Sequence, residues 1–474
     1  MSGQTTNQGA RRRKSKKSQP MAIANPDAAG IDVGATEHYV AVPPERDNQP
    51  IRHFKTFTVD LNAIADWLTE CGIRTVAMES TEVYWIPLCQ ILEDRGIEVK
   101  LVNARHVKNV PGRKSDVRDC EWLRQLHTFG LLTGSFRPEA KICVLRSYMR
   151  QREMLVKYAS YHVQHMQKAL TQMNLKLQQV ISDITGTTGM KIIRAILDGE
   201  RDGMKLAEMK DRRVKNSIET IAKALVGDYR EEHLFALNQS VELYEFYKQK
   251  VCECDRAILL EMRKFESKVD ADACGTSLPK QNNNTNGLGK KKKQGKGQRN
   301  QPTFDCQTEL YRITGVDLTR IDGISESTAQ LILSEIGMDV ASKWKTEAHF
   351  SSWLGLCPEN AISGGKILGR GTRKVVNRVA NALRMGAQSL LHSKSALGAF
   401  ARRIRTRRGT PIAITATAHK LARLVYRMLR YGQDYVDIGQ EQYETRYQTA
   451  LLRSLERRAR KLGYQLVVAT SPQA

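Results

Sequence analysis

The stretch around which the chain is organised, residues 111–123, reads PGRKSDVRDCEWL. A proline–glycine loop precedes Ser115, which is a good N-cap, so a helix is predicted to begin at about residue 116. Asp116 and Asp119 are three residues apart and therefore share one face of that helix. Two carboxylates about 4 Å apart repel by about 4 kcal/mol at an effective dielectric of about 20. A divalent cation or the neighbouring basic side chains would offset this repulsion, and a solvated helix start of mixed charge is the plain alternative.

The residues before this helix alternate between strand and helix patterns. Strands are predicted at 29–35, 38–42, 51–59, 73–79 and 97–102, and helices at 61–71 and 85–94. The order β-β-β-α-β-α-β-α predicts an α/β layered domain over residues 27–140. It places Asp32 on the first strand and Glu79 at the end of the fourth. Taken singly, Asp32 also fits a turn or edge acid, and Glu79 also fits a cap of the next helix.

The acids at these places suit a hard divalent cation. Magnesium prefers carboxylate oxygens and keeps several waters. Two such ions about 3.5–4 Å apart stabilise both the attacking and the leaving oxygen of a phosphoryl transfer. The order of the acids is similar to that of the ribonuclease-H-like fold of RuvC-type nucleases, in which acids at these places hold two magnesium ions.

The composition favours a polyanionic partner. Among 474 residues, 75 Lys and Arg stand against 50 Asp and Glu, a difference of 25, and such a balance is typical of nucleic-acid binding. No run of 18 or more apolar residues offers a membrane span, and the basic N-terminus has no secretory h-region. The nine cysteines are scattered without a zinc pattern, which predicts reduced thiols in the cytoplasm.

The remaining chain is predicted to divide by composition. The predicted parts are a disordered basic tail at 1–26, a helical or coiled-coil region at 141–268, a disordered Asn/Lys-rich linker at 269–305, a mainly α-helical C-terminal domain at 306–435 and a helical tail at 436–474. The middle helices suit either an antiparallel pair or a coiled-coil arm for subunit contact. Residues 321–332 resemble a helix-hairpin-helix, whose turn would offer backbone N–H groups to phosphate, and an ordinary tight turn fits them as well.

Ser363 is a candidate nucleophile because it precedes two glycines and so can lie on an open turn. A serine nucleophile needs access and nearby positive charge, although an S-G-G sequence is often only a turn. No Asp or Glu occurs from Ser363 to Arg430, so we expect this region to contact DNA or RNA. The basic residues expected to bind nucleic acid are Arg113, Lys114, Lys366, Arg370, Arg373, Lys374 and Arg378.

Four motifs occur together in one order. They are IDVG at 31–34, MEST at 78–81, KSDVRD at 114–119, and LGLCP at 354–358 followed by SGG at 363–365. In combination they resemble the DEDD transposases of bacterial insertion sequences, also called bridge-RNA-guided serine recombinases. The resemblance covers about residues 27–130 and 307–430.

The resemblance implies an N-terminal RuvC-like domain and a C-terminal serine transposase domain that combine into one active site. It implies that Asp32, Glu79, Asp116 and Asp119 bind Mg²⁺ (or Mn²⁺), and that Ser363 attacks DNA to form a phosphoserine link. The implied partners are double-stranded donor and target DNA, a noncoding guide RNA, and further copies of the chain in a dimer or tetramer. The implied location is the bacterial nucleoid.

Three positions depart from the family pattern. Glu82 stands where glycine is common, Ser115 where threonine is common, and Cys120 where alanine is usual. Glu82 adds a negative charge near Glu79 and is the departure expected to affect metal binding. Two other functions fit the sequence: a structure-selective metal-dependent nuclease that needs no serine, and a catalytically inactive nucleic-acid-binding scaffold.

Overall fold

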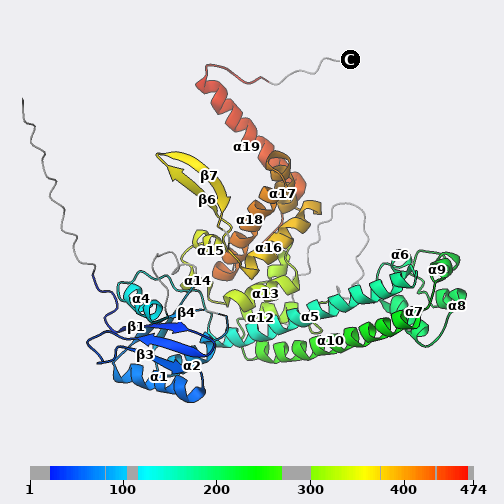
Figure 1. Ribbon diagram of the computed structural model, residues 1–474. Helices are drawn as coiled ribbons and strands as arrows, with labels where there is room; N and C mark the ends of the chain where they lie inside the picture. The colour runs from blue at the N-terminus through cyan, green and yellow to red at the C-terminus, as the bar shows by residue number, and fades with distance from the viewer. Residues whose placement is uncertain are drawn as a thin grey trace, which may run out of the picture. The chain divides into compact units, whose positions relative to one another are not determined.

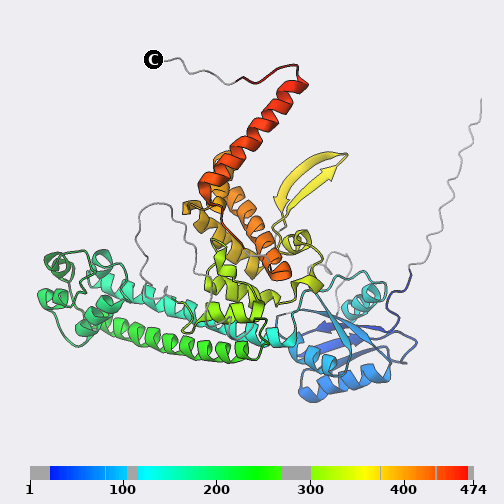
Figure 2. The ribbon, with the colours of Figure 1, turned by 180° about the vertical axis from the view of Figure 1, so that it is seen from behind.

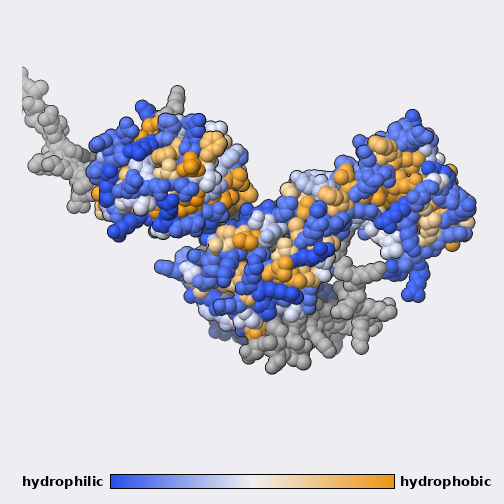
Figure 3. Space-filling model, turned by 90° about the horizontal axis from the view of Figure 1, so that it is seen from below, coloured by the Kyte–Doolittle hydropathy of each residue, from blue (hydrophilic) through white to orange (hydrophobic). Residues whose placement is uncertain are grey.

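The computed structural model describes residues 22–80, 82–103, 116–269, 300–373, 375–432 and 435–467. The chain divides into two compact units, residues 1–137 and 138–474. A sheet forms the centre of the first unit, and helices dominate the second (Figure 1). Hydrophilic residues cover most of the surface seen in Figure 3, and apolar residues show there in separate patches. Among the helices within the described ranges, none combines the length and apolar character needed to cross a bilayer.

Five strands form the N-terminal sheet in the spatial order β3-β2-β1-β4-β5. Their bounds are β1 Ala28–Val33, β2 Glu37–Ala41, β3 Ile51–Lys55, β4 Thr75–Glu79 and β5 Glu98–Val102. β2 pairs antiparallel with β1 and β3, whereas β4 pairs parallel with β1 and β5. The predicted α/β layer is confirmed.

The predicted strand at 51–59 is too long. β3 ends at Lys55, and helix α1 (Thr58–Glu70) takes up the last residues of that prediction. Asp60 lies in the first turn of α1, where a negative charge interacts favourably with the helix dipole. Val59 is 77% exposed on the helix surface, so its apolar side chain extended the alternating pattern without marking a strand.

Helices cover both faces of the sheet. α1 and α2 (Trp85–Asp94) pack with Ile31, Val76 and Met78 in a buried core on one face. α4 (Asp116–Thr128) contacts β1, β2 and β4. Because side chains alternate along a strand, Gly30 and Asp32 point to the face opposite Ile31, which is the face that α4 covers (Figure 1).

Gly30 is where α4 approaches the sheet most closely. A Cβ atom on Gly30 would lie 2.3 Å from the carbonyl oxygen of Cys120 and 2.4 Å from the backbone nitrogen of Arg124. Both atoms belong to the helix backbone and cannot rotate away. Only glycine therefore allows α4 to lie at this depth on β1.

An antiparallel helical pair begins the C-terminal unit. α5 (Ala140–Gln172) and α10 (Glu231–Arg263) pack along their length. The His162 ring stacks on Tyr247 with centroids 5.5 Å apart, and Met166 shares a core with Leu237. The far end carries α6 Leu177–Val180, α7 Thr187–Leu197, α8 Gly203–Glu208 and α9 Ile218–Ala224. The predicted helical region is present, and coiled-coil packing stays a prediction.

Where the structure describes it, the rest of this unit is helical apart from one hairpin (Figures 1 and 2). Its elements are α12 Cys306–Thr314, η1 Leu318–Arg320, α13 Glu326–Ile336, α14 Val340–Lys343, α15 Glu347–Trp353, β6 Pro358–Ser363, β7 Lys366–Thr372, α16 Arg378–Ser389, η2 Leu390–His392, α17 Ala396–Arg408, α18 Thr410–Tyr431 and α19 Gly439–Lys461. Trp344, Phe350 and Tyr426 form an aromatic cluster in its core. The mainly α-helical character is as predicted.

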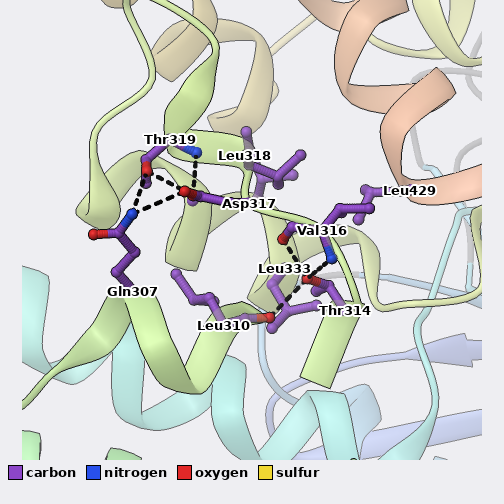
Figure 4. A pocket seen from close by; sticks show the side chains of 11 residues that line it. Gln307, Leu310, Thr314, Val316, Asp317, Leu318, Thr319, Leu333 and Leu429 are labelled. Carbon is purple, nitrogen blue, oxygen red and sulfur yellow. Dashed lines mark hydrogen bonds between the residues drawn. The ribbon is translucent and has the colours of Figure 1, made fainter. Parts of the chain in front are cut away.

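The turn between α12 and α13 is held by its own polar side chains (Figure 4). The buried Asp317 carboxylate accepts hydrogen bonds from the Thr319 backbone nitrogen at 3.0 Å and from Gln307 Nε2 at 2.8 Å. The adjoining cavity of about 10 Å³ has room for about one water molecule. Gly323, at φ +88°, lies against the α16 backbone at Gly386. The segment therefore serves packing here, and its helix-hairpin-helix role stays a prediction.

A buried ion pair joins α5, α10 and the chain entering α12. Arg152 Nε lies 2.5 Å from Asp255 Oδ1, with the Asp255 side chain fully buried. The other carboxylate oxygen accepts from the Thr303 backbone nitrogen at 3.0 Å, and Arg152 Nη2 donates to the Asn300 carbonyl at 3.0 Å. Residues 300–303, at the end of the predicted linker, are thus fixed to the helical pair.

We expect Arg152→Met to lower the free energy of unfolding of the C-terminal unit by about 3–5 kcal/mol, because it leaves a buried carboxylate without its cation. The double variant Arg152→Met/Asp255→Leu should recover most of this loss. Urea unfolding followed by circular dichroism measures both. Arg194→Met, which breaks the exposed pair with Glu245, is the control and should cost less than about 1 kcal/mol. Equal losses in the single and double variants would contradict the expectation.

Candidate active site

Asp32 and Glu79 lie at the carboxyl ends of two neighbouring parallel strands. The last paired residues of β1 and β4 are Ile31 and Met78, and the two acids follow them by one position. Parallel strands in register are about 4.8 Å apart and direct such residues to the same face. Both side chains are half-buried. The two carboxylates therefore flank one another on the face that α4 covers.

α4 runs in the direction opposite to β1 and β4. At its C-terminal end, His127 Nε2 lies 2.9 Å from the Thr75 hydroxyl at the start of β4. Its middle, at Cys120 and Arg124, crosses Gly30. The first turn of α4 is consequently directed toward the strand ends that carry Asp32 and Glu79.

Cys120, just after the first turn of α4, lies close enough to Asp32 for the two side chains to interact. The thiol is fully buried and bonds the Val117 carbonyl at 3.1 Å. Burial, and next the negative charge of Asp32, raise the pKa of Cys120 to about 12. The thiol is therefore protonated at neutral pH and serves as a small packing group. Asp119, the preceding residue, is half-buried.

The carboxylates supply the oxygen donors that a hard cation prefers. Asp116 is the first residue of α4, but its side chain lies outside the described part of the structure, as do Arg113, Lys114 and the N-cap Ser115. Among the described residues, no three His, Cys, Asp or Glu side chains are close enough to hold a metal ion. The donor chemistry thus fits a divalent cation, and the set of four acids stays a prediction.

Glu82 has a left-handed backbone conformation, with φ at +46°. This region is costly for a residue with a Cβ and open to glycine, which gives a physical reason for the glycine implied by the family pattern. The carbonyl of Glu82 accepts from Trp85 Nε1 at 3.1 Å, and the side chain is exposed. Glutamate in place of glycine at position 82 therefore strains the backbone and also adds a negative charge.

Ser363 is the last residue of β6, at the tip of the β6–β7 hairpin. It pairs with Lys366 across Gly364 and Gly365, whose φ values are +55° and +75°. Two positive φ values are typical of a type I′ turn. A Cβ at either glycine would meet nothing within 4 Å. The exposed Ser363 hydroxyl thus lies on an open tip, with the exposed Lys366 beside it.

The base of the hairpin is attached to α15. Arg373 donates to the Ser352 carbonyl and lies 3.4 Å from the Ser352 hydroxyl. At the start of α15, Glu347 binds Arg423 and Arg427 of α18. Hydrogen bonds from Arg427, the largest cause, and from Arg423 hold the pKa of Glu347 below its usual value. The tip of the hairpin is exposed, whereas hydrogen bonds and ion pairs of arginine side chains hold its base and the adjoining α15.

The predicted nucleic-acid-binding residues are not all equally available. Lys366 is exposed at the tip. Arg373 is used at the hairpin base, and Arg378 bonds Glu153 of α5 and lies 3.9 Å from Glu335. The side chain of Arg370 and the whole of Lys374 lie outside the described residues. Their binding roles stay predictions.

Two functional features were not recognised in the sequence. The hairpin carries a signal, since two glycines between apolar stretches are typical of a two-residue hairpin loop. Gly30 carries none, because nothing local distinguishes a glycine approached by a helix backbone from any other glycine in a strand.

Two family models match the chain. Residues 29–175 match the DEDD transposase model of IS110 type, described as a transposase. Residues 317–402 match the model described as a transposase of the IS116/IS110/IS902 family. The first match contains the strand ends and α4, and the second contains the hairpin with Ser363. None of the curated proteins matches the chain.

We expect the N-terminal unit to lose stability as the pH falls from about 6.5 to 4. His127 is buried, and burial, with a smaller effect of Lys100, lowers its pKa to about 4. The unfolded chain binds a proton near pH 6.5, so acidification favours unfolding throughout this range, by up to about 3 kcal/mol. Thermal unfolding at pH 7.5 and pH 5 measures the effect.

His127→Gln should reduce this pH dependence, and His38, whose pKa burial also lowers, should supply the remainder. His53→Gln, at an exposed histidine of the same sheet, is the control. A pH dependence in His127→Gln equal to that of the unaltered protein would contradict the role of this side chain.

We expect Glu82→Gly to raise the free energy of unfolding by about 1 kcal/mol, because glycine adopts the left-handed conformation without the Cβ clash. Asn174→Gly is the matched control, since Asn174 also has a positive φ of +60° but asparagine tolerates it better. Glu82→Gln removes the charge and keeps the strain. Urea unfolding of the three variants separates the two effects, and no gain in Glu82→Gly would contradict the strain.

Proposed function

This chain belongs to the IS110-type DEDD transposases, and we propose from that premise that it cleaves and rejoins DNA by attack of a serine hydroxyl. The observation that carries the proposal is Ser363. Its exposed hydroxyl lies on an open two-glycine turn, next to Lys366, within the second matched segment. A nucleophile that must reach a phosphodiester in a large polymer needs such access.

We assign the N-terminal sheet to the ribonuclease-H-like, RuvC-type fold. Support comes from the order β3-β2-β1-β4-β5, in which an antiparallel meander is followed by two parallel strands. In such mixed sheets the carboxyl ends of parallel strands commonly carry functional residues. Asp32 and Glu79 occupy two of these ends.

The carboxylates of Asp32, Glu79, Asp116 and Asp119 are proposed to hold a divalent cation, Mg²⁺ or Mn²⁺. When bound, such a cation supplies positive charge to the attacking and leaving oxygens of a phosphoryl transfer. Asp32 and Glu79 flank one another by strand register, and the first turn of α4 brings the other two acids toward them. Gly30 sets the depth of that turn.

The serine step exchanges one phosphoester for another. A bond forms between Ser363 Oγ and phosphorus, and the bond between phosphorus and one sugar oxygen breaks. The serine proton passes to a base, and the leaving sugar oxygen gains a proton. Because the phosphoserine link keeps the ester energy, a sugar hydroxyl can reverse the step and join a new DNA end. The family pattern supports the proposal that Ser363 and the four acids act in the same reaction.

The partners are proposed from the same pattern. They are double-stranded donor and target DNA, a noncoding bridge RNA, and other copies of the chain in a dimer or tetramer. The excess of 25 positive charges supports binding to nucleic acid. If a guide RNA pairs with the DNA, the protein needs to recognise only shape and backbone.

We expect purified protein with its co-purified RNA and magnesium to become covalently attached to end-labelled DNA that spans the junction of its element. Denaturing gels in SDS detect the adduct as a shifted band. Ser363→Ala should abolish it, since the bond-forming oxygen is absent. Asp32→Asn should lower it by about 10²-fold or more, because a charged ligand is lost. Ser454→Ala and Asp94→Asn are the matched controls and should leave the yield unchanged.

Other outcomes would contradict the proposal. Cleavage without an adduct that persists in Ser363→Ala would identify a metal-dependent nuclease. DNA binding without any cleavage, with the RNA present and either Mg²⁺ or Mn²⁺, would identify a nucleic-acid-binding scaffold.

A further inference from the structure

The sheet edge that carries the candidate acids also carries exposed aromatic residues. β3 runs in the same direction as β1, because each of them pairs antiparallel with β2. The carboxyl ends of β1, β3 and β4 therefore lie at one edge, where the Thr56 hydroxyl is 3.5 Å from the Ala35 carbonyl. Phe57 follows β3 and is 68% exposed, and Tyr84 follows β4 and is 38% exposed. Two exposed aromatic residues thus adjoin the ends of the strands.

Both aromatic residues stand where a helix-capping side chain is expected. Phe57 is the N-cap of α1 and Tyr84 is the N-cap of α2, and neither side chain bonds a backbone N–H of its helix. Ser, Thr, Asp and Asn are strongly preferred at this position. Glu82, in the same loop as Tyr84, has a strained backbone. Since local rules are commonly broken at functional sites, we infer that the exposed rings serve a ligand rather than their helices.

Trp85, the next residue, shows how a structural aromatic side chain is held in this loop. Its Nε1 donates to the Glu82 carbonyl at 3.1 Å, and the Arg137 guanidinium lies 5.7 Å from its ring centroid. Within the described ranges, Tyr84 has no hydrogen-bond partner and no ring contact. Its ring is therefore available to a group from outside the protein.

We propose that Tyr84 stacks on an unpaired base next to the phosphate that reacts at the candidate acids. Stacking on aromatic side chains is a common way in which proteins hold unpaired bases, and it accepts any base because every base has a ring face. This inference rests on the proposed function and specifies the form of its substrate. The strand is cut where its bases are out of the duplex.

The two faces of the sheet separate the phosphate from the base. Asp32 and Glu79 point to the face that α4 covers, whereas Tyr84 begins a helix on the opposite face. A nucleotide laid across the edge therefore places its phosphate beside the acids and its base beside Tyr84. The exposed Glu82 repels a phosphate on this side, and its carboxylate can accept from N–H groups of a base. Phe57, three strand spacings or about 14 Å from β4, is placed to meet a further base.

Other occupants fit this edge less well. An apolar protein surface would cover Tyr84 only by burying the neighbouring Glu82 carboxylate, which is unfavourable without a cationic partner. A fully paired duplex offers no ring face, because each base is covered by its neighbours in the stack. An unpaired base offers a ring face to Tyr84 and N–H groups to Glu82.

Photo-cross-linking tests the contact without requiring the reaction. The probe is junction DNA with 5-iododeoxyuridine at one position at a time, bound with the co-purified RNA to the Ser363→Ala chain, and mass spectrometry identifies the linked residue. One position at the junction should link to Tyr84. Tyr84→Phe should keep the link because it keeps a ring, and Tyr84→Ala should lower it by about tenfold or more. Tyr464→Ala, at an exposed tyrosine outside both matched segments, is the control and should leave it unchanged.

An abasic nucleotide then separates stacking from a structural role of the ring. With Ser363 present, Tyr84→Ala should slow formation of the covalent adduct by about tenfold on intact DNA, and Tyr84→Phe by less than about twofold. When the nucleotide that links to Tyr84 is made abasic, the unaltered chain and Tyr84→Ala should react equally, because no base is left to stack.

Three results would each overturn the proposal: no link to Tyr84, equal losses in Tyr84→Phe and Tyr84→Ala, or a difference between Tyr84→Ala and the unaltered chain that persists on abasic DNA. A link to Tyr84 without any adduct would support the stacking contact and contradict the proposed serine reaction alone.

Discussion

The close contact between α4 and β1 at Gly30 is the constraint on which the N-terminal unit depends. The helix backbone lies so near the strand that a single methyl group would meet Cys120 O at 2.3 Å. This depth brings His127 to Thr75 at one end of the strands and the first turn of α4 to Asp32 at the other. The proposed approach of the acids to one another thus depends on a backbone contact rather than on attraction between them, since carboxylates repel. Burial of apolar side chains on the opposite face supplies the stability that this arrangement needs.

The C-terminal unit places its candidate nucleophile in a different way. Ser363 stands on an exposed turn, and the order around it comes from the charged contacts at the hairpin base and on α15. Many of the basic side chains in this unit bind other groups of the protein, as Arg373, Arg378, Arg423 and Arg427 illustrate. Net charge therefore overstates the number of side chains free to bind phosphate, and Lys366 at the tip is the clearest of those available.

Regular patterns made much of the fold predictable. The strand alternation around Ile31 and Met78 and the helix at 85–94 were correctly identified, since burial imposes a period on the sequence. The third strand was predicted too long because Phe57 and Val59 continue the alternation into α1. The hairpin was missed although its two glycines signal it. The depth of α4 at Gly30 and the strain at Glu82 depend on tertiary contacts and backbone angles. Such features produce no repeating pattern in the sequence. Local patterns singled out the four acids and Ser363 as candidates, the family resemblance implied their roles, and their joint action stays a prediction.

The buried pair of Arg152 and Asp255 also has a topological consequence. Before residue 270 the chain is held by Lys268 N, which donates to Arg312 O, and by Arg312, which donates to Phe265 O. After residue 299 it is held by Arg152 through Asn300 O. The first anchor lies just beyond the end of α10, and the second joins α5 to α10 through Arg152 and Asp255. When both ends of a segment are fixed, each doubling of the number of residues between them costs only about 0.6 kcal/mol of closure entropy. Residues inserted between positions 269 and 300, or a break made there, should therefore leave these contacts of α5, α10 and α12 in place.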